Sequence, residues 1–183
     1  MTFSIVGSTP VCEAGFLAVD RVDVRAPGGE VLERHVVRHP GAVVVVPVDG
    51  DGSVLMVRQY RAAVGHDLLE IPAGKRDVDG ESPEATAVRE LEEEIGRRAG
   101  TLVPLCEFYN SPGFTDEYTY LFLATDLEVT ARAAVSAEEA AMTVEAVPLD
   151  DVDALIASGE LVDAKSIIGV LTARARLRGE RRP

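Results

Sequence analysis

The chain has 183 residues, of which 46% are hydrophobic and 27% charged, as in an ordinary globular protein. Its net charge of −13 makes nucleic acid an unfavourable partner, because an acidic surface repels phosphate backbones. No apolar run approaches the roughly 18 residues that span a membrane, and two cysteines do not make a disulfide framework. We therefore expect a cytoplasmic protein with reduced thiols that binds neither nucleic acid nor membrane.

The predicted elements begin with strands joined by turns rich in glycine. Loose alternation predicts an N-terminal hairpin made of residues 16–25 and 31–38, with Ala-Pro-Gly-Gly between them. Residues 42–48 are apolar throughout and predict a buried strand. An Asp-Gly-Asp-Gly turn follows, so we expect residues 54–60 to be the partner of that strand in a second hairpin.

A helix is clearly delimited in the middle of the chain. Ser82 suits the N-cap position, Pro83 the first helical position and Gly96 the position just past the end. Strands and helices then mix without regular alternation, which favours an α+β fold: a mixed β-sheet between helices, with an N-terminal antiparallel hairpin. The remaining strands are expected at 68–72, 102–109, 118–124 and 142–147, and the remaining helices at 150–158 and 163–178.

The helix after Ser82 carries carboxylates crowded on one face. At about 100° per residue, Glu90, Glu93 and Glu94 share a face that differs from the apolar one. Like charges at these spacings repel, and they lie near the partially negative end of the helix. Either their pKa values rise or hard cations bind among them; an ordinary solvated acidic face is the competing interpretation.

The segment before the helix favours the cation interpretation. Ala73 and Gly74 form a tight turn, and a glycine there lets a backbone carbonyl approach the same cations. Carboxylate and carbonyl oxygens are the ligands that Mg²⁺ and Mn²⁺ prefer. These residues therefore predict a divalent metal site built from the helix and the preceding turn.

The same residues resemble the signature of the Nudix hydrolases. That signature is Gly-x5-Glu-x7-Arg-Glu-U-x-Glu-Glu-x-Gly-U, where U is a bulky apolar residue, and this chain matches it fully from Glu81 to Gly96. Two positions depart from it: six residues separate Gly74 from Glu81, and Arg97 fills the last apolar position. Because so many positions are specified, the match is a strong indication of the family.

Segments outside the signature are similar to the ADP-ribose pyrophosphatase branch of that family. Pro112 stands 15 residues after Arg97, and residues 59–61, 69–74 and 164–167 also fit the branch. The resemblance implies metal-dependent hydrolysis of the phosphoanhydride bond of ADP-ribose, which gives AMP and ribose 5-phosphate.

The resemblance also implies an architecture, an α/β/α Nudix-like sandwich. Residues 1–40 would form an N-terminal β subdomain for dimerisation and substrate binding, and residues 41–183 the hydrolase domain. In the family the N-terminal segment crosses to the other subunit, so a homodimer is expected.

The family pattern assigns roles to the acidic helix. By resemblance, Glu90 and Glu94 are direct metal ligands, Glu93 lies beside them, and the Ala73 carbonyl completes the shell. Two to three ions of Mg²⁺ or Mn²⁺ per site would bridge the diphosphate and lower the pKa of a bound water. Arg89 would orient the glutamates.

The general base and the substrate contacts are less sharply indicated. By resemblance the base is Glu139 or Glu138, in the loop of residues 135–140, with Glu93 as the rival. Candidate contacts to the diphosphate, the riboses and the adenine ring are Arg61, Arg34, Glu70, Phe16 and Pro112. Arg61 and Arg34 could instead be ordinary surface arginines, Phe16 a core residue of the hairpin, and Glu70 a carboxylate that closes a strand end. The loop of residues 135–140 could likewise be an ordinary solvated loop.

Two other functions compete with the ADP-ribose interpretation. The substrate could be another nucleotide sugar or dinucleotide, such as GDP-mannose, NADH or FAD. The chain could also be a non-catalytic ligand sensor of the same fold. Such sensors usually lose signature glutamates or carry a DNA-binding extension, whereas this chain keeps Glu90, Glu93 and Glu94 and has no basic helix-turn-helix segment.

Overall fold

The computed structural model describes residues 2–134 and 136–179. The chain forms two compact units: residues 1–42 with 108–119, and residues 43–107 with 120–183. The predicted ranges 1–40 and 41–183 also include residues 1, 135 and 180–183, which lie outside the described residues.

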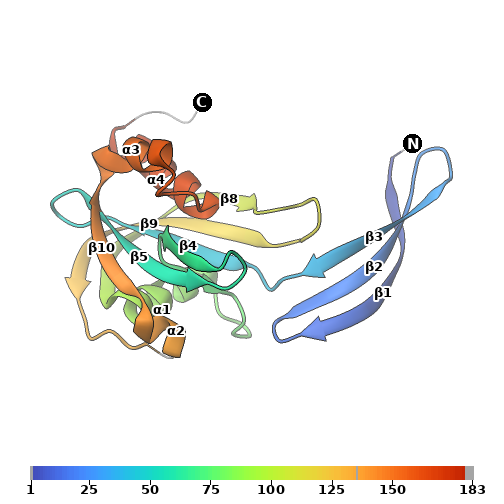
Figure 1. The fold of residues 1–183 in the computed structure, drawn as a ribbon, viewed down its shortest axis with the longest axis horizontal. Coiled ribbons are helices and arrows are strands. Elements are labelled where there is room, and N and C mark those ends of the chain that lie inside the picture. Colours follow the sequence, from blue (N-terminus) through green and yellow to red (C-terminus); the bar gives the residue numbers. More distant parts are fainter. Residues whose placement is uncertain (1, 135, 180–183) are drawn as a thin grey trace. The chain divides into compact units, whose positions relative to one another are not determined.

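The first unit contains a three-stranded antiparallel sheet in the order β1-β2-β3 (Figure 1). Its strands are β1 (Ser4–Ala14), β2 (Leu17–Arg25) and β3 (Val31–Arg38). The predicted N-terminal hairpin is therefore confirmed as β2 and β3. The sequence pattern did not indicate β1, whose register shifts between Ile5 and Gly7 and again between Pro10 and Cys12. Gly7 and Pro10 interrupt the alternation by which a strand is recognised.

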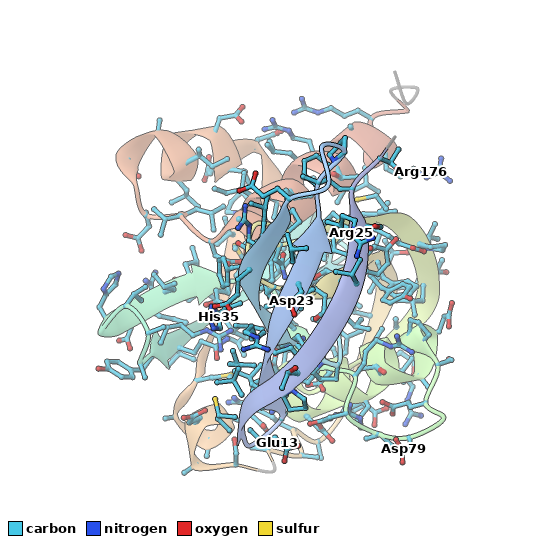
Figure 2. All side chains as sticks on the ribbon, turned by 90° about the vertical axis from the view of Figure 1, so that its right-hand side faces the viewer. Glu13, Asp23, Arg25, His35, Asp79 and Arg176 are labelled. Atoms are coloured by element: carbon cyan, nitrogen blue, oxygen red, sulfur yellow. The ribbon has the colours of Figure 1, made fainter. Side chains whose placement is uncertain are left out.

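Most side chains of this sheet are exposed. Nearly every residue of β1 is exposed, whereas Val22 of β2 is 2% exposed. Figure 2 looks onto the sheet and labels Asp23 and Arg25, which lie on β2, and His35, which lies on β3.

The segment of residues 108–119 docks on the free edge of β3. The amide of Val37 donates to the Phe114 carbonyl at 2.8 Å, and the amide of Asp116 donates back to Val37. The Asp116 carboxylate accepts from Arg38 Nη1 at 3.0 Å and from the His39 amide at 2.9 Å. These contacts hold the turn that contains Pro112 against β3.

The second unit contains two sheets. One has the order β10-β5-β6 and the other the order β7-β4-β9-β8. The strands are β4 (Ala42–Pro47), β5 (Ser53–Arg61), β6 (His66–Glu70), β7 (Ala73–Lys75), β8 (Arg97–Tyr109), β9 (Tyr118–Val129) and β10 (Thr143–Pro148), and the first unit includes the end of β8 and the start of β9.

The predicted second hairpin is wrong in its pairing. The Asp-Gly turn does reverse the chain, but it gives an isolated bridge between Val48, which follows β4, and Val54 of β5. β4 pairs instead with β7 and β9, and β5 with β10 and β6. A turn brings two strand ends together, yet β4 is buried along its whole length and uses both edges for partners distant in sequence.

Helices cover both sides of these strands (Figure 1). Val43 and Val45 face α1, while Val46 faces α4, as alternation along a strand requires. The helices are α1 (Pro83–Ile95), α2 (Ala137–Ala141), α3 (Val152–Ser158) and α4 (Ala164–Leu177), with a 3₁₀ turn at Leu149–Asp151.

Close packing of α4 depends on Gly169. A Cβ at this position would lie 2.5 Å from Ile71 Cδ1 and 3.1 Å from Val46 Cγ2. The arrangement confirms the predicted α+β class with strands between helices. Among the described helices, none has the length and apolar character of a membrane span.

Candidate active site

Local capping sets the limits of α1 as predicted. The Ser82 hydroxyl accepts the Ala85 amide at 3.2 Å, and Pro83 occupies the first turn. Gly96 ends the helix with φ 60°, a left-handed conformation that favours glycine. These caps fix where each following carboxylate lies on the helix.

Glu90 and Glu94 are buried, which was not expected for a solvated acidic face. Their exposed fractions are 8% and 4%. Burial raises the pKa of Glu90 to about 7, partly opposed by the charge of Arg89. Burial, with the nearby charge of Glu90, raises the pKa of Glu94 to about 8, although the Ala73 amide donates to Glu94 at 3.1 Å.

Gly74 makes room for the Glu90 carboxylate. A Cβ built on Gly74 would lie 1.9 Å from both Cδ and Oε1 of Glu90, far inside any real contact. The backbone of the turn before α1 therefore reaches the carboxylates because residue 74 has no side chain. This contact and the Ala73 hydrogen bond join the turn to the acidic helix.

Arg89 holds the neighbouring carboxylates in place. Its Nε and Nη2 each lie 3.2 Å from a different oxygen of Glu81, and its Nη1 lies 2.7 Å from Glu90 and 2.9 Å from Glu93. These partners raise the pKa of the guanidinium, chiefly through Glu81, and Arg89 in turn lowers the pKa of Glu81. The Thr86 hydroxyl also donates to Glu81 at 2.8 Å.

The donor set is chemically suited to a hard divalent cation. Two buried carboxylates and the backbone turn packed against them offer oxygen atoms, the kind of ligand that hard divalent cations prefer. Within residues 2–134 and 136–179, no three His, Cys, Asp or Glu side chains are already gathered in the geometry of an ion site. Arg89 Nη1 bridges Glu90 and Glu93.

A second ion-pair network lies at the end of β5 and β6. Arg61 Nε and Nη2 contact the two oxygens of Glu70 at 2.7 and 2.6 Å, and Glu70 is 1% exposed. Lys165 Nζ lies 3.8 Å from Glu70 and 2.6 Å from Asp163. The pKa of Arg61 is raised mainly by Glu70, with a smaller contribution from the charge of Glu94. Arg61 therefore lies within electrostatic reach of the carboxylate helix.

The loop expected to supply the base contains the short helix α2, a difference from prediction. Its Ser136 N-cap accepts the Glu139 amide at 3.1 Å and donates to the Glu139 carboxylate at 3.0 Å. The charge of Glu139 contributes to the raised pKa values of Glu90 and Glu94, whereas Glu138 is exposed. Val135, the first residue of the predicted loop, lies outside the described residues.

Three predicted substrate residues belong to the first unit. Phe16 is 48% exposed and makes an edge contact with His39 at 5.4 Å between ring centroids. Arg34 is exposed and donates to the Glu33 carbonyl at 2.7 Å. Pro112 is exposed in the turn that docks on β3.

Several residues of the site were not singled out for a role from the sequence. Thr86 is completely buried and orients Glu81, while Lys165 and Asp163 support Glu70. Glu81 and Lys165 do stand in motif segments, which was the available signal. No sequence feature distinguished Thr86, because the role of a threonine inside a helix shows only in the contact that its hydroxyl makes.

Comparisons with known proteins bear on this site. Residues 37–167 match the family described as the NUDIX domain. The chain is 40% identical over 181 residues to the ADP-ribose pyrophosphatase of Mycobacterium tuberculosis, covering 99% of this chain and 87% of that protein. It is 43% identical over 148 residues to the ADP-ribose pyrophosphatase of Bacillus subtilis, covering 81% and 80% of the two chains.

A solved structure shows the same fold. The crystal structure of an ADP compounds hydrolase superposes with a TM-score of 0.87 over 100% of this chain and 98% of that one, at 23% identity. The family match spans the buried carboxylates of α1, the Gly74 turn and the Arg61 network. From its sequence, and with a fold that agrees, this chain belongs to the Nudix family and is a Nudix hydrolase.

Proposed function

We propose that this protein hydrolyses the phosphoanhydride bond of ADP-ribose, giving AMP and ribose 5-phosphate. The observation that carries the proposal is the pair of buried carboxylates, Glu90 and Glu94, packed against the Ala73–Gly74 turn. Two relatives of 40% and 43% identity that carry the name ADP-ribose pyrophosphatase support the choice of substrate.

Nudix hydrolases are in general dependent on divalent metal ions, and the oxygen-rich donor set of this chain suits them. We assign the ions as Mg²⁺ or Mn²⁺, two to three per site, held by Glu90, Glu94, Glu93 and the Ala73 carbonyl. When bound, such ions neutralise the diphosphate and activate a water molecule for attack on phosphorus.

The chain's own residues supply orientation and proton transfer. Arg89 contacts Glu81, Glu90 and Glu93 at the same time, so we assign it the role of orienting these carboxylates. Glu139 is our candidate for the base that takes a proton from the attacking water, since its charge already acts on Glu90 and Glu94. Glu138 and Glu93 are the alternative bases.

Substrate contacts complete the proposal. Arg61 is suited to phosphate oxygens because the guanidinium presents several donors in a plane, and Glu70 holds that plane in a fixed orientation. Glu70 is also a candidate for a ribose hydroxyl. We also assign substrate contacts to Phe16, Arg34 and Pro112. Residues 1–40 would form the segment through which two copies of the chain dimerise. A homodimer in the cytoplasm is part of the same proposal.

A substrate panel tests this assignment. Pure protein with Mg²⁺ is assayed on ADP-ribose, GDP-mannose, NADH and FAD, and ADP-ribose is expected to give the largest kcat/KM. Glu94→Gln should lower kcat/KM by at least about 100-fold while the protein stays folded. Glu92→Gln is the matched control, since Glu92 lies on the same helix but pairs with Arg98 at 2.7 Å. A fully active Glu94→Gln enzyme would refute the metal assignment.

A further inference from the structure

Gln59 of β5 is buried with a hydrogen-bond donor left unused. The side chain is 8% exposed, and its Nε2 has no hydrogen-bond partner among the residues that the structure describes. A buried donor without an acceptor destabilises a folded protein, and proteins satisfy the great majority of such groups. The position therefore demands an explanation beyond packing.

The pleat of β5 shows which way Gln59 points. Leu55 and Val57 lie on the face that packs against Leu91 of α1, in the core cluster. Side chains alternate along a strand, and β5 pairs with β6 in regular register, so Gln59 and Arg61 continue this same face. On this face of β5, Gln59 is the next residue after Val57, the last apolar core residue of the strand.

An ion pair between Arg61 of β5 and Glu70 of β6 lies on the same face as Gln59. Glu70 pairs across from Val57, and Leu68 pairs across from Gln59. Arg61 reaches over to Glu70 with two hydrogen bonds. Along this face of β5, Gln59 therefore lies between the apolar residues that pack against α1 and the Arg61–Glu70 ion pair.

We propose that Gln59 Nε2 is a substrate-binding donor for an acceptor oxygen of the nucleoside diphosphate, on a phosphate or a ribose hydroxyl, beside Arg61. This inference rests on the proposed function. The unused donor is costly in the free enzyme and becomes satisfied in the complex, so the hydrogen bond contributes more to binding than an exposed one would. Gln59 then favours substrates that bring an oxygen to this position.

Gln59→Leu tests the assignment, because leucine fills similar space without a donor. KM for ADP-ribose should rise about 10-fold, since a buried site built to hydrogen-bond its ligand discriminates strongly. The melting temperature of the ligand-free variant should equal or exceed that of the wild type. AMP and ribose 5-phosphate as inhibitors then show which half of the substrate carries the oxygen, since only that product should bind more weakly.

Two results would overturn the proposal. One is a KM and product affinities that stay within about twofold of wild type, which is less than one buried hydrogen bond supplies. The other is a clear fall in the melting temperature of the ligand-free protein, which would mean that another group satisfies Nε2 before substrate arrives. Gln59→Met carries the same test if the leucine variant does not fold.

Thr130→Val is the matched control. The Thr130 hydroxyl is also buried without a partner among the described residues, but it lies where the chain passes Gly96, beyond the end of α1. Removing it should leave KM unchanged. Failure of the proposed function is recognised separately, because wild-type protein would then not hydrolyse ADP-ribose at all.

Discussion

The two units of this protein use their apolar side chains in opposite ways. In the second unit, β4 is fully buried, and Val43, Val44, Val45 and Val46 are each 0% exposed. In the first unit, Ile5 of β1 is 67% exposed, and Phe3, which directly precedes β1, is 63% exposed. A sheet is stable by itself when a hydrophobic face is buried, and most side chains of β1 are exposed. The second unit is therefore stabilised by its own core, whereas the first unit leaves large apolar side chains exposed.

The units also differ in whether their charged side chains are exposed or buried. Arg38, Asp20 and Asp116 form an ion-pair cluster whose members keep between 18% and 40% exposure. Glu90 and Glu94 are instead buried in the second unit with raised pKa values. Exposed pairs contribute little to folding, whereas burial disfavours the ionised form of a carboxylate, so ionisation of Glu90 and Glu94 opposes folding of the second unit.

The largest expected effect comes from filling the space at Gly74. Gly74→Ala puts a Cβ where Glu90 now lies, at 1.9 Å, so the carboxylate must move. We expect kcat/KM to fall by about 100-fold, because the proposed metal ligand Glu90 is displaced. Gly50→Ala, where nothing lies within 4 Å of the new Cβ, is the control and should keep wild-type kinetics. Normal activity of the Gly74 variant would show that the Ala73–Gly74 turn is not part of the active site.

Metal-free protein should lose stability as the pH rises. The folded-state pKa values of about 7 for Glu90 and about 8 for Glu94 lie above the ordinary value of 4.5, so folding favours the protonated acids. Stability is full below pH 4.5 from these groups and is lost as the pH rises through about 8. Between pH 5.5 and 8.5 we expect a fall of roughly 5–10 °C in Tm with EDTA present.

The matched variant for this pH experiment is Glu94→Gln, whose Tm should depend much less on pH. Added Mg²⁺ should raise the Tm of the wild type more at pH 8.5 than at pH 5.5, because cations bind the ionised carboxylates. A Tm that stays flat over this range in metal-free wild-type protein would show that the two acids are already ionised or solvated.

A charge on β1 should test the need of the first unit for a partner. Ile5→Asp places a carboxylate in the exposed apolar strand, so the proposed dimer should dissociate about 10-fold or more readily by sedimentation, because burying an unpaired charge is costly. Val129→Asp, at another position with 78% exposure, is the control. A wild-type protein that sediments as a stable monomer would remove the proposed dimer.

The smallest expected effect concerns the exposed ion pairs. Asp116→Asn keeps an acceptor for the His39 amide but weakens the pair with Arg38 at 3.0 Å. The loss of unfolding free energy should be below about 1 kcal/mol, as for other exposed pairs. Chemical denaturation measures it, and a loss several times larger would mean that the docked segment supports the whole first unit.

Much of this protein could be predicted from local sequence alone. Ser82, Pro83 and Gly96 determine where α1 begins and ends, since caps act through backbone groups a few residues away. Spacing along that helix determined that Glu90, Glu93 and Glu94 share a face, and resemblance of the signature indicated the family. Interactions between residues that are close in sequence can be predicted from the sequence itself.

Tertiary structure alone decided the rest. It paired β4 with β9 and not with β5, since backbone hydrogen bonds between strands distant in sequence carry no local pattern. It also brought Gly74 onto Glu90 and left Gln59 Nε2 buried beside the Arg61 network. Burial depends on every element packed around a group. The raised pKa values of Glu90 and Glu94 therefore follow from the fold as a whole.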